Sequence, residues 1–147
     1  MWRVACQIDR SFDTTVLKGP IKLTCMKVLL GVGGSDESRR ALTQTVERAV
    51  EADDELTIAI FETDERDEGR EEIERDVKTE LEGAGLDATI RHIEEAPESE
   101  LLRIAEEEGF DQIVIGGGRA SPMGKIKLGP ITEFVLVNAQ VTVKLIR

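Results

Sequence analysis

The chain has 147 residues, and its 30 acidic and 19 basic side chains leave a net charge of −11. This length fits one domain rather than two, and the negative charge argues against nucleic-acid binding because an acidic surface repels a phosphate backbone. The two cysteines have no CxxC pair or histidine cluster beside them, which argues against a disulfide scaffold and a zinc site.

The sequence also bears on the compartment. No apolar run approaches the roughly 18 residues of a membrane span, and charges interrupt the apolar N-terminus that a signal peptide would need. We therefore expect a cytoplasmic protein with no membrane partner. The acidity fits either an ordinary soluble protein or one adapted to a salty cytoplasm, where ions screen repulsion among carboxylates. The lack of tyrosine and the excess of arginine over lysine favour the salt-adapted, halophilic interpretation.

Residues 1–25 differ in composition from the rest of the chain. They contain four basic and two acidic side chains, a balance of +2, so the remaining residues sum to −13. At Met26 the sequence changes to a buried strand that leads into a glycine turn. We expect residues 1–25 to be an N-terminal extension, or the result of a start site placed too early, and residues 26–147 to form the domain. A docking arm that uses Trp2 and Val4 is the alternative.

From residue 26 onward, apolar strands alternate with helical patterns, which is typical of a parallel sheet with helices on its faces. Strands are predicted at 28–32, 56–61, 88–93, 112–115 and 141–146. Helices are predicted after Ser35, within the acidic segment 62–82, from Pro97 and from Pro130. Right-handed crossovers then give an α/β fold with a doubly wound, five-stranded parallel sheet.

Catalytic side chains are scarce. The single histidine, His92, falls in the third predicted strand, where a structural or surface role is more common than that of a general base. Without it, no Ser–His–acid or Cys–His arrangement exists. The carboxylates of 62–82 fit a solvated helix face better than a metal site. We therefore predict no catalytic residue, no metal and no enzyme activity, with weak ATP hydrolysis left open.

Two glycine-rich turns are the candidate ligand sites. One spans 31–35 after the first predicted strand, and the other spans 116–125 after the fourth and runs on to Gly129. In an open α/β sheet, ligands bind beyond the carboxyl ends of the strands, where helix N-termini point. A P-loop ending at Lys125 fails, because Arg119 and Ile126 stand where it needs glycine and a hydroxyl residue.

A dinucleotide-binding fingerprint that starts with Gly31 and Gly33 is a weaker alternative. Its third glycine position holds Asp36, which would set a carboxylate beside the pyrophosphate. Glu62, at the end of the second predicted strand, would suit a ribose hydroxyl. An enzyme that uses a dinucleotide or hydrolyses a nucleotide is therefore the least favoured interpretation.

Three segments resemble the universal stress protein family. They are MKVLLGVGGSDES at 26–38, DQIVIGGG at 111–118 and NAQVTVKLIR at 138–147, similar to its first strand and turn, its fourth strand and turn, and its last strand. The resemblance covers essentially all of 26–147. It implies an adenine-nucleotide alpha-hydrolase-like fold with strand order 3-2-1-4-5, and a homodimer paired through the C-terminal strand. In one branch of the family it also implies an ATP site between the first and fourth strands.

That branch is expected to hold phosphates and ribose with G-x2-G-x9-G-[ST], and adenosine with an aspartate after the first strand. Gly116 and Gly129 match the first and last glycines, and Thr132 matches a hydroxyl residue just inside the final helix. The residues that depart from the pattern are Arg119 for the middle glycine, Pro130 for the hydroxyl residue and Gly33 for the aspartate.

These departures weaken the implied site. Pro130 removes a hydroxyl and a backbone N–H, and Gly33 removes an acceptor for the base or ribose. Arg119 adds bulk, although its guanidinium can clamp a phosphate through two hydrogen bonds, and Lys125 and Lys127 add positive charge. We therefore predict a dimeric stress-response module with a degenerate or weakened nucleotide site. The residues of the alternative, an ATP-binding stress protein, are Gly116, Arg119, Gly129 and Thr132.

Overall fold

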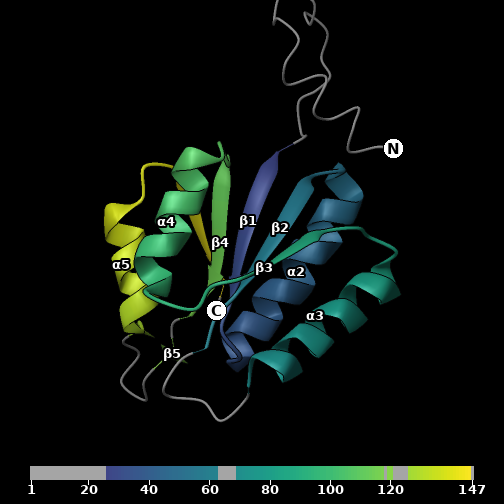
Figure 1. Ribbon diagram of the computed structural model, residues 1–147, viewed down its shortest axis with the longest axis horizontal. Helices are drawn as coiled ribbons and strands as arrows, with labels where there is room; N and C mark the ends of the chain where they lie inside the picture. Colours follow the sequence, from purple (N-terminus) through teal and green to yellow (C-terminus); the bar gives the residue numbers. More distant parts are fainter. Residues whose placement is uncertain (1–25, 63–68, 118, 121–125, 147) are drawn as a thin grey trace, which may run out of the picture.

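The structure is a computed structural model that describes residues 26–62, 69–117, 119–120 and 126–146. Its centre is a parallel sheet of five strands in the order β3-β2-β1-β4-β7 (Figure 1). The strands are β1 (Lys27–Val32), β2 (Glu55–Ile60), β3 (Thr89–His92), β4 (Gln112–Gly116) and β7 (Thr142–Ile146). This is the 3-2-1-4-5 order that the family resemblance implies, so the prediction of the fold is confirmed.

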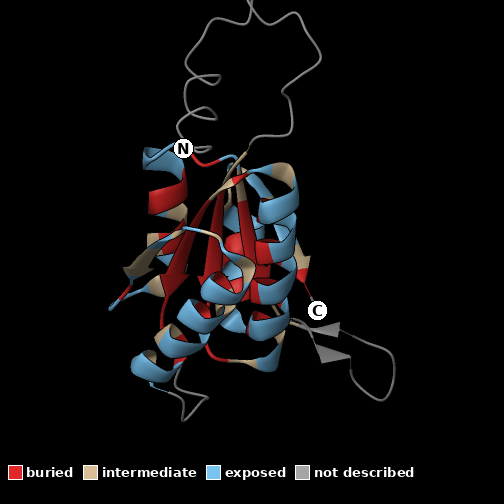
Figure 2. Ribbon diagram, turned by 90° about the vertical axis from the view of Figure 1, so that its right-hand side faces the viewer, coloured by how far each residue is buried: buried red, intermediate tan, exposed pale blue. Residues whose placement is uncertain are grey.

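Helices cover both faces of the sheet. On one face, to the right in Figure 1, lie α2 (Asp36–Ala52) and α3 (Arg70–Ala84). On the other lie α4 (Pro97–Glu107) and α5 (Pro130–Asn138). Figure 2 shows that the buried residues concentrate in the sheet between these two layers, while the outer faces of the helices are exposed.

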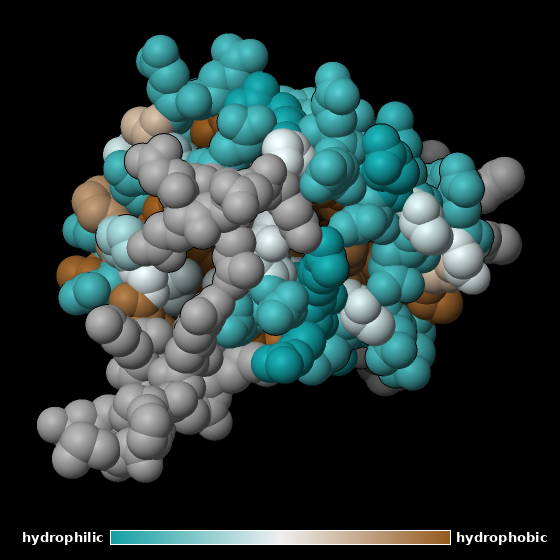
Figure 3. Space-filling view, turned by 90° about the horizontal axis from the view of Figure 1, so that it is seen from below, coloured by the Kyte–Doolittle hydropathy of each residue, from teal (hydrophilic) through white to brown (hydrophobic). Residues whose placement is uncertain are grey.

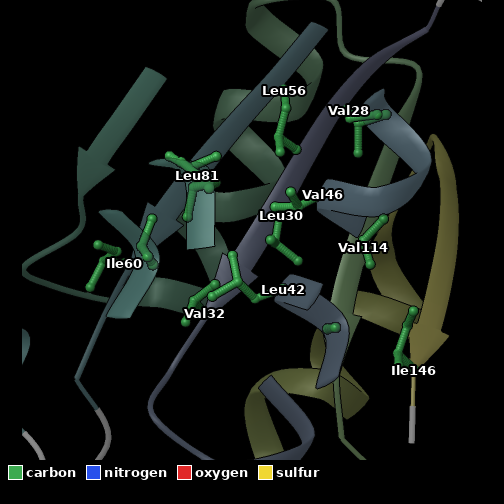
Figure 4. Packing of buried hydrophobic residues seen from close by; sticks show 14 of the residues in the cluster. Val28, Leu30, Val32, Leu42, Val46, Leu56, Ile60, Leu81, Val114 and Ile146 are labelled. Carbon is green, nitrogen blue, oxygen red and sulfur yellow. The ribbon is translucent and has the colours of Figure 1, made fainter. Parts of the chain in front are cut away.

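The core is continuous through β1, the middle strand. Successive side chains of a strand point to opposite faces, so Leu30 packs on the α2 side with Val46 and Leu56 (Figure 4), and Leu29 packs on the α4 side with Ile113. Both leucines are fully buried, and each contributes about 1.5–3 kcal/mol to stability. A strand covered on both faces needs the uninterrupted apolar run that the sequence shows here.

Capping residues set the helix boundaries. Ser35 caps α2 by accepting a backbone N–H, and Pro97 and Pro130 stand in the first turns of α4 and α5, as predicted. α3 continues through Gly83 and ends at Gly85, which adopts the left-handed conformation that favours glycine. The strand boundaries lie within one residue of the predicted ones.

Three local features differ from the prediction. A small antiparallel hairpin, β5 (Arg119–Ala120) and β6 (Ile126–Lys127), forms where we expected only a loop. The helical spacing of apolar residues between 41 and 50 predicts that Val50 belongs to the buried stripe of α2. Val50 is instead half exposed, because 100° of rotation per residue carries it past the margin of that stripe. Phe61, assigned to the second strand, lies just beyond the end of β2.

The C-terminal strand β7 is an outer strand of the sheet, paired with β4. The neighbouring helix α5 leaves Phe134, Leu136 and Val137 exposed, and Val137 is 76% exposed. Within the part of the chain that the structure describes, no helix is long and apolar enough to cross a membrane.

Candidate functional site

The two glycine turns meet at one edge of the sheet. β1 and β4 are neighbours in parallel register, with Gly31 opposite Ile115, so the turns that follow both strands lie at the carboxyl edge. This edge is at the bottom of Figure 1, and Figure 3 looks onto it. The described surface there is mainly hydrophilic, with small apolar patches. We call this place, between the turns after β1 and β4, the crevice.

The N-terminus of α2 faces the crevice and uses its own hydroxyl groups. Ser35 Oγ accepts the N–H of Ser38 at 3.0 Å, and Ser38 Oγ accepts the N–H of Gly33 at 3.2 Å. The two hydroxyl oxygens are 3.1 Å apart, and Ser38 is buried. Asp36 and Glu37 follow in the first turn of α2. Protein groups therefore satisfy N–H donors that a phosphate would use, and carboxylates occupy the favourable end of the helix dipole.

The turn after β1 is packed against an aromatic ring. Phe61 is 4% exposed, and a Cβ atom added to Gly33 would lie 2.7 Å from its Cε2 atom. A Cβ atom on Gly31 would lie 3.3 Å from Cε1 of the same ring and 3.3 Å from Cδ1 of Leu101. Position 33 is where the family resemblance implies an adenosine-binding aspartate. The ring of Phe61 takes the space that any side chain at position 33 would need.

The turn after β4 is packed against backbone. A Cβ atom on Gly116 would lie 2.3 Å from the carbonyl oxygen of Glu37 and 2.7 Å from the amide nitrogen of Ser38. A Cβ atom on Gly117 would lie 2.8 Å from Thr132 Oγ1. Gly116 is therefore required for the close approach of β4 to α2, whether or not a ligand binds, whereas Gly117 meets only a side chain of α5.

The structure brings together four of the predicted site residues and leaves the others apart. Gly31, Gly33, Gly116 and the buried Thr132 lie at the packed floor of the crevice. Gly129 is the exposed residue before α5, with no side-chain cap and open space around its Cα. The backbone of Arg119 belongs to β5, whereas its side chain lies outside the described residues, as does Lys125.

The single histidine is on the surface, as predicted. His92 ends β3 and lies 3.1 Å from Glu74 Oε1 of α3, and this hydrogen bond lowers the pKa of the Glu74 carboxyl. An open groove of about 350 Å³ lies nearby between β3 and α4, and its arginines are paired: Arg91 with Glu108, and Arg103 with Glu100 and Glu107. Among the described side chains, no group of three or more potential metal ligands comes together.

Sequence reasoning missed three residues of the crevice. Phe61 was assigned only to a strand, Ser38 was not singled out, and Gly117 was treated as part of a glycine run. The sequence does contain a signal for Ser38, because a hydroxyl side chain three residues after an N-cap residue lies close enough to form a hydrogen bond with it. No signal for Phe61 exists in the local sequence, because its contact with Gly33 joins the ends of two strands that are far apart in the sequence.

Comparisons with known proteins agree with this architecture. A universal stress protein from Archaeoglobus fulgidus is 21% identical, with a TM-score of 0.69, and the match covers 83% of this chain and 98% of that one. A universal stress protein in complex with cAMP is 23% identical, with a TM-score of 0.64 and coverage of 84% and 98%. A protein from Mycobacterium tuberculosis is 32% identical, with a TM-score of 0.56 and coverage of 86% and 98%. A search of curated protein sequences returned no significant match.

The family assignment rests on the sequence as well as on the fold. The model of the Universal stress protein family matches residues 59–147, which is more than half of the chain. The strand order β3-β2-β1-β4-β7 agrees with that match. The chain belongs to the universal stress protein family.

Proposed function

We propose that this protein is a universal stress protein that acts as a dimeric, non-enzymatic module, and that its nucleotide site is closed. The observation that carries the proposal is the contact between Phe61 and Gly33. An adenosine group needs both an open space and a polar partner at the end of β1. Here a buried ring fills the space beside Gly33 that a side chain would enter, and glycine offers no side-chain acceptor.

The rest of the crevice supports the same conclusion. Pro130 begins α5 without an N–H, so one donor that could face a phosphate is missing. The acids of the first turn of α2 add negative charge at the other helix N-terminus. The described residues therefore do not fit the ATP that the family resemblance implies. The single histidine of the chain belongs to β3 and not to the crevice, which supports a role without catalysis.

Association with a second copy of the chain is the interaction that the sheet favours. β7 is an outer strand, and such a strand presents unpaired N–H and C=O groups that a second strand can bond. The exposed Phe134 and Val137 of α5 lie on the helix that packs beside this strand. We expect light scattering in concentrated potassium chloride to give the mass of a dimer. A monomer at all concentrations would contradict this part of the proposal.

Adenine-nucleotide binding is the second candidate function. The relative solved in complex with cAMP favours it, since that protein shares the fold. Binding here would depend on groups outside the crevice floor, above all the guanidinium of Arg119. If Arg119 clamps a phosphate, Arg119→Ala should abolish the affinity for nucleotide.

A calorimetric titration tests the two candidates against each other. ATP with magnesium, and separately AMP, would be titrated into the full chain in concentrated potassium chloride. We expect no saturable heat and no thermal shift at millimolar nucleotide. Saturable binding that disappears in Arg119→Ala would overturn the closed site and establish the second candidate. Saturable binding that persists in Arg119→Ala would overturn the closed site and also remove Arg119 from it.

A further inference from the structure

Asp54 is a buried carboxylate at the amino edge of the sheet, opposite the crevice. It lies between α2 and β2, and its side chain is 1% exposed. Its Oδ1 atom accepts the N–H of Met26 at 3.0 Å, just before β1 begins. The position of Met26 is fixed independently, because its carbonyl accepts the N–H of Glu55 at 2.8 Å.

The second oxygen of Asp54 is poorly satisfied. Within the described ranges, no group donates a hydrogen bond to Oδ2, and its nearest cation is the half-exposed Arg48, whose Nε atom lies 3.6 Å away. Asp53 and Asp111 add negative charge around it. A cavity of about 10 Å³ adjoins it, lined also by Lys144, and has room for one water at most.

Such an environment calls for a cationic donor. A buried carboxylate is costly unless it is paired with a positive charge and its lone pairs are hydrogen-bonded. The amide of Met26 supplies one N–H and no charge. An α-ammonium group on the same nitrogen, 3.0 Å from Oδ1, would supply a full charge and three donors without moving β1.

We propose that Asp54 is a binding site for the α-ammonium group of Met26, so that the working protein begins at Met26. Initiation at this methionine or removal of residues 1–25 would each create that group. The change of composition at the same residue, from a balance of +2 before it to −13 from it onward, is an independent observation. The proposal concerns the amino edge and holds whether or not the crevice binds a nucleotide.

The first test is the mass of the N-terminal peptide of the protein made from its own gene in its own cells. We expect a peptide that begins at Met26 with a free amine. A peptide that contains residues from 1–25 would overturn the proposal.

The second test compares Asp54→Asn in two chains, residues 1–147 and residues 26–147. In 26–147 the substitution leaves the ammonium without its counter-charge, so we expect the thermal midpoint to fall by about 5 °C or more. In 1–147 it removes a poorly satisfied buried charge and keeps the acceptor for the amide, so we expect an unchanged or higher midpoint. Acetylation of the Met26 amine in 26–147 should abolish the fall in thermal midpoint that Asp54→Asn causes in that chain.

Asp87→Asn is the matched control, because it makes the same charge change at an exposed position before β3. This substitution should change the midpoint by the same amount in both chains. Equal effects of Asp54→Asn in the two chains, or failure of 26–147 to fold, would overturn the proposal.

Discussion

The two edges of the parallel sheet differ in how their groups are satisfied. At the carboxyl edge, where the fold opens toward a ligand, the turns are closed by contact: Phe61 lies against Gly33, and Gly116 lies against the backbone of α2. At the amino edge, Asp54 and Asp111 accept the N–H groups of two consecutive residues at the start of β1. Among the described side chains, Asp54 Oδ2 and Arg70 Nε are the buried polar atoms without a hydrogen bond, and the carboxylate oxygen lies at the edge where the fold is not expected to bind.

This difference separates two reasons for a glycine-rich turn. A glycine can be needed so that a ligand approaches the backbone, or so that another part of the protein does. At Gly116 and Gly33 the structure shows the second reason, since protein atoms already occupy the space of a Cβ atom. The number of glycines in a turn is therefore a weaker guide to binding than what faces them.

The largest effect is expected from Gly116→Ala. The new Cβ atom would lie 2.3 Å from the carbonyl oxygen of Glu37, which belongs to the helix backbone and cannot rotate away. We expect the free energy of unfolding to fall by at least about 3 kcal/mol. Denaturant unfolding in concentrated potassium chloride measures it.

Gly83→Ala is the control for that substitution. Gly83 lies inside α3 with open space around it, so alanine should raise the free energy of unfolding by about 0.5–1 kcal/mol. If both substitutions change stability by the same small amount, the crevice floor is not packed as described, and the contrast between the two edges fails.

A double-mutant cycle measures the contact between Phe61 and Gly33 at the end of β1. Gly33→Ala alone should cost about 1–3 kcal/mol, because its Cβ atom would meet the ring of Phe61. Phe61→Ala alone should cost about 3–5 kcal/mol through the cavity that it leaves. In the double variant the clash is gone, so we expect the combined loss to be smaller than the sum by about 1 kcal/mol or more.

The matched cycle pairs Phe61→Ala with Gly129→Ala. Gly129 has open space around it and an extended backbone that alanine adopts freely, so these losses should add. Additivity in both cycles would show that the ring does not fill the space beside Gly33. The second candidate function would then gain support.

Local signals in the sequence were enough to predict the helices and strands of the fold. The apolar runs of β1 and β4 lie on strands buried on both faces, and Ser35, Pro97 and Pro130 mark helix starts that depend on adjacent residues. The order of the outer strands followed from the family resemblance rather than from any of these signals.

The state of the candidate site could not be predicted in the same way. Whether Gly33 faces a ligand or a ring depends on Phe61, which is distant in sequence and directly follows the neighbouring strand β2. From the sequence alone, Asp54 cannot be distinguished from the other acidic residues of a chain that has 30 in total. No neighbouring residue indicates that its side chain is buried. Contacts between elements decide both cases, whereas periodicity reports only one element at a time.

The smallest expected effect is a pH dependence at the amino edge of the full chain. Burial raises the pKa of Asp54, against the lowering effects of the Met26 N–H and Arg48. The folded state then binds this proton more tightly than the unfolded state does. Its contribution to stability is present below the unfolded pKa of about 3.9 and is lost as pH rises through the higher folded value.

Asp54→Asn should remove this loss of stability at higher pH, because asparagine does not titrate and its amide oxygen still accepts the Met26 N–H. In urea unfolding of the full chain between pH 4 and pH 8, the variant should gain stability relative to the parent as pH rises. Asp87→Asn, the same charge change at an exposed position, should leave the profile parallel to the parent's. If the Asp54→Asn profile is also parallel, the Asp54 carboxylate is fully paired in the full chain. The polar groups at the amino edge are then as well satisfied as those at the carboxyl edge.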